Sequence, residues 1–443
     1  MQNNKTVKIS ISVLGLLILS ASFLHWCASA GKEPIYMLWA FISAALFAAV
    51  CLRFVPHWID FWSEYKETVQ DGFDDDKTCV VIFVSCLAVC FVVLILSWLI
   101  KLLSGWQGSF RESLSLWLNL DSRHYLDIAR DWYLSEGEWD RLVQLVFFPG
   151  YPLLVRLFGL FIKDTLYAAF VSSALCFGLS GIMMYRLMRL DMTRERALTA
   201  LKYMCLVPGV FFFAAPMSES LFLCLCLSSV YCARKRKWIL AGMLAALAGF
   251  TRSLGVMLAV PIIFELIHFK PRGRELTKAV LGVVLIPFGL AAYCLINYQV
   301  SGDAFKFMEY QRVHWGQEMG WFFNTAAYQL ECAVTYWQSG NVKVALGLWG
   351  ANLLVCFASL IIMLRGVKGL RASYGAYFLC YYIGAIGATW LLSAPRYMAV
   401  MFPLPAALSL LSGNKRVDLF VTLILAVSSA LYLCAFVLGC QVW

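Results

Sequence analysis

The sequence predicts an all-α polytopic membrane protein of about thirteen transmembrane helices, with short helices at one membrane surface. Hydrophobic residues make up 61% of the 443 residues and charged residues only 14%, far below the quarter usual in soluble domains. Apolar runs of about 20 residues, long enough to cross a bilayer, recur along the chain. The basic residues gather in the connections between these runs, as the positive-inside bias predicts.

The first apolar run, residues 9–30, follows Lys5 and Lys8 and ends in Ala28-Ser29-Ala30, so it resembles a secretory signal. It is long for a signal peptide, and we interpret it as an uncleaved first span. With a second span and an acidic loop it makes an extra N-terminal unit, residues 1–78, ahead of the main membrane domain, residues 79–440.

The remaining spans follow from the same apolar pattern, and several are short enough to be broken or re-entrant. In order, the thirteen expected spans are 9–30, 36–55, 79–104, 165–189, 199–214, 217–233, 238–252, 254–268, 278–299, 342–364, 373–393, 396–412 and 417–440.

Orientation follows from the lysines and arginines, which place five basic connections inside: 186–196, 234–237, 270–278, 365–371 and 415–416. The N-terminus then lies inside and the C-terminus outside. The apolar segment 147–163 would reverse every later loop if it crossed, so we expect it to lie along the outer surface or to dip into the membrane and return. Two large outer loops, 105–164 and 300–341, are rich in aromatic and charged residues and predict a site at the outer face.

Several function classes lose support. The net charge of +10 is spread over membrane connections, with no aromatic and basic face suited to nucleic acid. The 16 cysteines lie mostly in apolar runs without a CxxC pair, which is typical of buried thiols. No GxxxxGK[ST], GxSxG or HExxH motif occurs. The acidic triplet Asp74-Asp75-Asp76 lies in the loop expected inside, so we interpret it as a solvated loop.

The segment DSRHYLDIARDWY in the first outer loop predicts a short amphipathic helix that begins at Asp121. Spacings of three and four residues put Asp121, His124 and Tyr125 on one face. A carboxylate there can act as a general base. Asp121 can equally be a helix N-cap, for which Asp is well suited.

Three more charged residues fall at outer helix ends. Glu219 begins a span, where a carboxylate can merely stabilise the helix N-terminus. Arg252 and Arg396 lie at short outer turns, where a guanidinium can bind phosphate through its planar fork or simply extend toward lipid headgroups.

In the second outer loop, Gln311, His314 and Trp315 can share a helix face. A histidine there could donate a hydrogen bond to a phosphate or a sugar hydroxyl. The spacing of His124, His314 and the carboxylates gives no support to a metal site, so none is expected.

Asp121-Ser-Arg-His-Tyr-Leu-Asp-Ile-Ala resembles the first-loop motif of the GPI mannosyltransferase 2 (PIG-V) family and its bacterial relatives. Five further segments are similar to that family's motifs in the same order, over roughly residues 79–440: FFPGYPLLVR, Ser218-Glu219-Ser220, Arg252-Ser253, Gly302-Asp303 through His314-Trp315, and Arg396-Tyr397. Leu254 departs from the pattern, since relatives often carry Asn there, and residues 1–78 precede the usual start.

The resemblance implies a GT-C glycosyltransferase fold and a polyprenyl- or dolichyl-phosphate donor, usually of mannose. It gives Asp121 the role of base, and by position we expect Arg252, Arg396 and His314 to face the donor phosphate. The expected reaction is inverting, needs neither cofactor nor metal, and delivers the hexose to a glycolipid or glycan at the outer face of a bacterial plasma membrane. A lipid-linked sugar flippase and a non-catalytic carrier-binding protein are the alternatives, and the oligomeric state is open.

Overall fold

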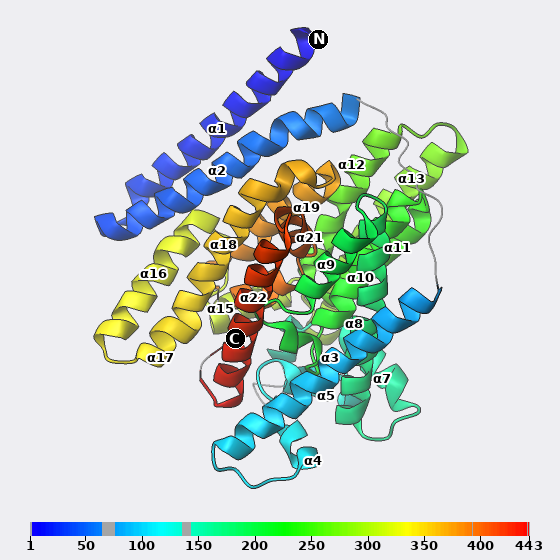
Figure 1. Cartoon of the computed structure of the whole chain (residues 1–443), viewed down its shortest axis with the longest axis vertical. Helices are drawn as coiled ribbons and strands as arrows, with labels where there is room; N and C mark the ends of the chain where they lie inside the picture. The colour runs from blue at the N-terminus through cyan, green and yellow to red at the C-terminus, as the bar shows by residue number, and fades with distance from the viewer. Residues whose placement is uncertain (1, 64–75, 135–142, 392, 441, 443) are drawn as a thin grey trace.

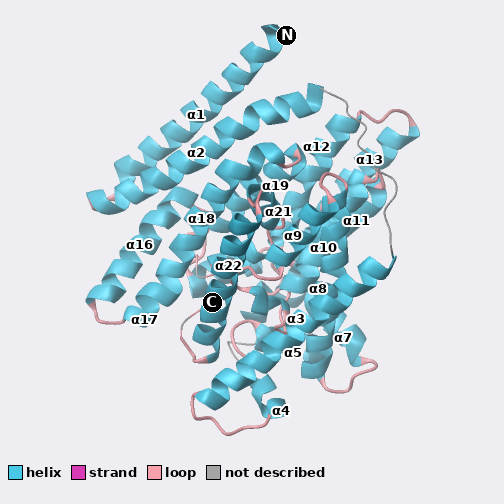
Figure 2. Ribbon diagram, viewed as in Figure 1, coloured by secondary structure: helices cyan, strands magenta, loops and turns pink. Residues whose placement is uncertain are grey.

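The computed structural model of the chain describes residues 2–63, 76–134, 143–391, 393–440 and 442. Helices account for 81% of the structure, and Figure 2 shows helices joined by loops throughout the drawn chain. Within the described ranges, the only β pairing is a single antiparallel bridge between Met319 and Ala388. The prediction of an all-α protein is therefore confirmed.

Seven helical stretches are long and apolar enough to cross a membrane, among the residues that the structure describes. Seven helices of this length and apolar character expose surface that suits lipid and not water, so the chain is a membrane-spanning protein. The seven stretches are α1 (Gln2–Ala30), α2 (Pro34–Ser63), α3 (Asp76–Leu103), α8 (Thr165–Arg189), the pair α13 (Arg274–Leu285) and α14 (Pro287–Ser301), the run from α17 (Val342–Val344) through α18 (Ala351–Gly366), and α22 (Lys415–Val437).

Four other expected spans correspond to shorter helices: α10 (Glu219–Arg234), α11 (Trp238–Thr251), α12 (Ala259–Phe269) and α19 (Ala372–Ile386). The longest of them, α10, has 16 residues, or about 24 Å at 1.5 Å per residue. These helices are short for a straight crossing of a hydrocarbon core about 30 Å thick.

The two remaining expected spans, 199–214 and 396–412, are broken in the structure. Over 199–214, α9 (Arg194–Met204) ends early and a short 3-10 turn, η3 (Val210–Phe213), follows Gly209, whose φ is 91°. Over 396–412, α20 (Ala394–Ala399) stops before α21 (Pro403–Leu411), since Pro403 cannot continue a helix. A Cβ at Gly209 would lie 3.4 Å from the Pro395 carbonyl oxygen, so the turn after α9 lies against the start of α20, next to the buried Arg396.

Within residues 2–63, α2 and the turn that precedes it pack against the rest of the chain. Phe47 of α2 contacts Phe322 at 4.5 Å between ring centroids, and Lys32 pairs with Glu331 at 2.5 Å. Both partners belong to α16 (Phe322–Gln338), which lies beside α2 in Figure 1. The expected outer loop 300–341 therefore contains a 17-residue helix, which the interrupted apolar pattern of that segment does not reveal.

Short helices collect at one end of the bundle. In Figure 1, α4 (Phe110–Ser113), α5 (Ser122–Asp131) and α7 (Gly150–Gly159) lie at the end opposite the α12–α13 connection. With ten residues, α7 is too short for a straight crossing of a bilayer, and it is not among the seven stretches that are long and apolar enough to span. The position of 147–163 at the outer surface stays a prediction.

Close helix contacts fix the position of α11, which ends beside the candidate site. Gly242 of α11 faces Gly282 of α13, and Gly289 of α14 faces the carbonyl of Ala246. A Cβ at Gly242 or Gly289 would overlap that facing backbone. Small residues allow such close approach in membrane bundles. These contacts fix the position of α11 along α13 and α14.

Candidate functional site

A pocket of about 440 Å³ is formed between α5, the end of α11, α15 (Lys306–Trp315) and α20. This volume lies within the range of small-molecule sites. Eight of the ten predicted site residues line it: Asp121, His124, Tyr125, Arg252, Gln311, Trp315, Arg396 and Tyr397. Segments more than 250 residues apart in sequence thus meet around one cavity.

Asp121 occupies the N-cap position of α5, but its side chain makes no capping hydrogen bond. Its carboxylate Oδ2 instead pairs with Nη2 of Arg396 at 2.6 Å. The preceding Leu120 has a φ of 58°, a left-handed conformation that is uncommon for a residue with a side chain. This turn directs the Asp121 carboxylate into the pocket, and the structure contradicts the interpretation of Asp121 as a side-chain cap.

Glu219 lies behind the pocket at the start of α10 and is fully buried. Its Oε1 accepts hydrogen bonds from Nε of Arg396 and Nη1 of Arg252. Its Oε2 is buried without a hydrogen-bond partner among the described residues. One carboxylate oxygen thus joins both guanidinium groups, and with Asp121 the four side chains balance two positive and two negative charges.

Two aromatic rings lie beside the Arg252 guanidinium. Its Cζ lies 5.2 Å from the centroid of Tyr397 and 5.9 Å from that of Phe222, within the distance at which cation–π attraction acts. Its Nη1 also donates to Ser218 Oγ at 3.2 Å. These contacts fix the orientation of the guanidinium plane toward the pocket.

Tyr125 ties α5 to the same cluster through a hydrogen bond of 3.1 Å between its hydroxyl and Ser218 Oγ. Burial raises the pKa of Tyr125 to about 12, and the nearby Asp121 charge adds to this. The hydroxyl therefore stays protonated and can donate at neutral pH.

One wall of the pocket is aromatic. Phe147 stacks on His124 with ring centroids 4.5 Å apart and meets the edge of Trp315 at 6.4 Å. Phe147 precedes α7, whose Gly150 touches Thr251 so closely that a Cβ would lie 3.0 Å from the Thr251 Cα. This contact sets the aromatic wall beside Arg252.

Several lining residues were absent from the sequence prediction: Phe147, Phe148, Gln317, Trp390 and Ser393. The FFPGYP pattern singled out the segment of the first two but not their role. Gln317 and Trp390 reach the pocket because two loops pair, with the Gln317 amide donating to the Trp390 carbonyl at 3.0 Å. No local pattern in the sequence indicates that pairing.

His314 does not line the pocket, although its neighbours Gln311 and Trp315 do. Its ring lies 5.4 Å from Tyr310 and 6.2 Å from Trp315 on α15. The expected contact of His314 with a donor phosphate is therefore not supported by its position. In the acidic triplet, Asp76 begins α3, whereas Asp74 and Asp75 lie outside the described residues.

In the described part of the chain, no three His, Cys, Asp or Glu side chains gather closely enough to hold a metal ion. All 16 cysteines, each in a described range, are free thiols.

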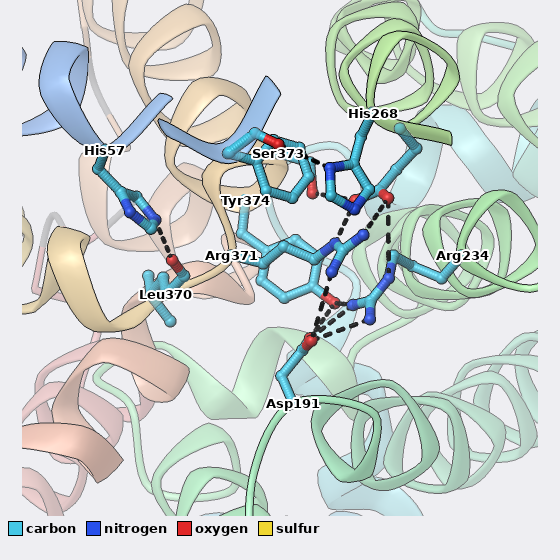
Figure 3. A network of polar contacts seen from close by, with 10 residues as sticks. His57, Asp191, Arg234, His268, Leu370, Arg371, Ser373 and Tyr374 are labelled. Carbon is cyan, nitrogen blue, oxygen red and sulfur yellow. Dashed lines mark hydrogen bonds and ion pairs between the residues drawn. The ribbon is translucent and has the colours of Figure 1, made fainter. Parts of the chain in front are cut away.

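A second buried charge network lies at the other end of α10 (Figure 3). Arg234 forms two bonds to Asp191, of 2.5 and 2.9 Å, and Arg371 forms two bonds to Glu265, of 2.6 and 2.7 Å. Ser373 and Tyr374 donate to these carboxylates, and Arg371 also approaches Asp191 at 3.8 Å. Burial acts to raise the pKa of Asp191, but Arg234 outweighs it, so the pKa lies below its ordinary value.

This network joins the basic connections near 186–196, 234–237 and 365–371 at one end of the bundle. Fifteen helical steps separate Glu219 from Arg234, which is about 22 Å. These basic residues predicted the orientation of the chain, but their pairing with Asp191 and Glu265 was not predicted from the sequence.

The fold and the pocket define an all-helical membrane-spanning protein with a charged, aromatic-walled cavity at one end of its bundle. We compared the chain with protein-family models, curated proteins and solved structures, and none of the three comparisons finds a match.

Proposed function

We propose that the chain is a membrane glycosyltransferase that moves a hexose, by resemblance mannose, from a polyprenyl- or dolichyl-phosphate donor to a glycolipid or glycan acceptor. One observation carries the proposal: the pocket combines a partly exposed carboxylate, Asp121, with two oriented guanidinium groups, Arg252 and Arg396. Transfer from a sugar phosphate needs both kinds of group.

In the proposed reaction, the acceptor hydroxyl attacks the anomeric carbon and gives its proton to the Asp121 carboxylate. The bond between that carbon and the phosphate oxygen breaks, and the phosphate leaves with the electron pair. Arg252 and Arg396 stabilise the charge of the leaving phosphate, as fixed cationic groups do at other transferred phosphates. A single direct attack inverts the anomeric centre, so a β-linked donor gives an α-linked product.

The proposal includes a GT-C fold, about thirteen crossings in which short and broken helices take part, and an active site on the non-cytoplasmic face of a bacterial plasma membrane. The positive-inside bias supports that orientation. The aromatic wall of Phe147, His124 and Trp315 suits a sugar ring, whose apolar face packs on aromatic side chains.

The test is sugar transfer by the purified protein in detergent, with extracted membrane glycolipids as acceptors. Polyprenyl-phosphate mannose and a nucleotide-linked mannose are compared as donors, with chelator present and absent. We expect transfer from the lipid phosphate donor alone, unchanged by the chelator. Transfer from the nucleotide sugar alone would refute the proposed donor class, and loss of transfer with chelator would refute the metal-independent chemistry.

Absence of transfer from every donor, together with tight binding of the carrier lipid, would refute the enzyme proposal. That outcome would favour a flippase or a non-catalytic carrier-binding protein instead. Reconstitution in vesicles then separates these two, because only a flippase moves a labelled carrier lipid between leaflets.

A further inference from the structure

In this structure the candidate base, Asp121, is bound to Arg396, a residue that we expect to bind the donor phosphate. Arg396 donates through Nη2 to Asp121 at 2.6 Å and through Nε to Glu219. A carboxylate bound to a guanidinium in this way is poorly placed to accept a proton from a hydroxyl, because its lone pairs already face a cation. The same bond occupies an edge of Arg396 that a phosphate would use.

The two carboxylates on Arg396 differ in how easily they can be displaced. The Glu219 side chain is 0% exposed and sits behind both arginines, whereas the Asp121 side chain is 31% exposed and borders the pocket. Displacing Glu219 would leave a buried charge uncompensated, which is strongly unfavourable. Releasing Asp121 leaves its carboxylate in the open pocket, so Asp121 is the exchangeable partner.

Arg252 has donor capacity left on the pocket side. Its two bonds to described side chains, Glu219 and Ser218, both use Nη1. A guanidinium carries five N–H donors in a planar fork. An anion in the pocket can therefore bind Arg252 without breaking a bond, and it gains Arg396 once Asp121 moves away.

We infer that Asp121 occupies the position on Arg396 that the donor phosphate takes when it binds, so that donor binding itself releases the base. The inference rests on the proposed function and adds a regulation of the same site. The phosphate anion takes the Nη2 edge of Arg396 and the free edge of Arg252, while Glu219 continues to hold both arginines. Asp121 then turns to the acceptor hydroxyl, takes its proton as the new glycosidic bond forms, and remains unable to act until a donor is present.

The inference predicts an unusual result for a catalytic carboxylate. Asp121→Asn removes the competitor for Arg396, so this variant should bind polyprenyl phosphate more tightly than wild type while its transfer rate falls. One charge-assisted hydrogen bond corresponds to about a 10- to 100-fold change in the dissociation constant. Binding is followed by the change in intrinsic tryptophan fluorescence, because Trp315 and Trp390 line the pocket and their surroundings change when a ligand enters.

Two matched variants make the test specific. Asp127→Asn neutralises a carboxylate of the same helix that pairs with Arg130 at 3.7 Å, and it should bind like wild type. Arg396→Lys keeps the charge but cannot bridge Asp121 and Glu219 together. In that background, adding Asp121→Asn should tighten binding far less, because the competition acts through the Arg396 fork.

Equal or weaker binding by Asp121→Asn, in protein that elutes and melts like wild type, would overturn the inference. Undiminished tightening in the Arg396→Lys background would also overturn it, because simple repulsion between Asp121 and the phosphate would then be sufficient. Failure of the proposed function gives a different result. If Asp121→Asn bound polyprenyl phosphate more tightly but wild type transferred sugar from no donor, the competition at Arg396 would stand and the transferase proposal would be refuted.

Discussion

Glu219→Gln is the substitution whose effect follows most directly from the structure. Glu219 is 0% exposed, and its Oε1 accepts from both Arg252 and Arg396. Glutamine has the same shape, so no cavity forms, but two neighbouring guanidinium groups lose their shared counter-charge. The site changes from a balanced set of two positive and two negative charges to a net positive one in buried surroundings.

Breaking a buried ion pair by neutralising one partner costs about 3–5 kcal/mol. For a chain of this size each kcal/mol lowers the melting temperature by about 2 °C, so we expect a fall of about 5–10 °C. The assay is tryptophan fluorescence during heating in detergent, for which the 16 tryptophans supply the signal. Melting is compared at a fixed protein and detergent concentration.

Glu309→Gln is the matched control, because Glu309 pairs with Lys306 at 2.8 Å while its side chain is 44% exposed. An exposed pair contributes about 0–1 kcal/mol, so this variant should melt within about 2 °C of wild type. If Glu219→Gln melted together with Glu309→Gln, the argument that Glu219 holds the two arginines through buried charge would be refuted.

Three further results are expected. Arg234→Met should lower the free energy of unfolding by about 3–5 kcal/mol with little change in donor KM, since the network lies about 22 Å from the pocket; a raised KM with unchanged melting would contradict this. The folded-state pKa of Asp191 lies below its unfolded value near 3.8, so its stabilisation is complete above that pH and is lost only as pH falls through the lower value; Asp191→Asn should remove this acid-dependent part of the melting curve, and an unchanged curve below pH 4 would be the contrary result. Phe147→Ala removes the stack on His124 and should raise the acceptor KM by about 2- to 10-fold with kcat maintained; an unaltered KM would remove Phe147 from acceptor binding.

Much of the membrane architecture could be predicted from the sequence because apolar length is a local property. The seven long apolar helices followed from run length alone. The breaks near Gly209 and Pro403 and the helix α16 did not, because apolar run length alone does not distinguish a broken helix from a continuous one. The helix α16 carries too many polar residues for its apolar pattern to stand out.

Most residues of the candidate site could be predicted from the sequence, but the ion pairs and hydrogen bonds between them could not. Spacing put Asp121, His124 and Tyr125 on one face, and all three line the pocket. The bond between Asp121 and Arg396, and the position of Glu219 behind both arginines, join segments that only tertiary structure brings together. The same holds for Asp191 and Glu265 in the second network, whose partners lie 43 and 106 residues away.

The most direct test of Asp121 as the base is the rate of sugar transfer by Asp121→Asn, measured with polyprenyl-phosphate mannose beside wild type and Asp127→Asn. General base catalysis contributes about 10²- to 10⁴-fold, so we expect a loss of that size for Asp121→Asn and a rate close to wild type for Asp127→Asn, with both variants melting normally. Undiminished transfer by Asp121→Asn would contradict the assignment of Asp121 as the base.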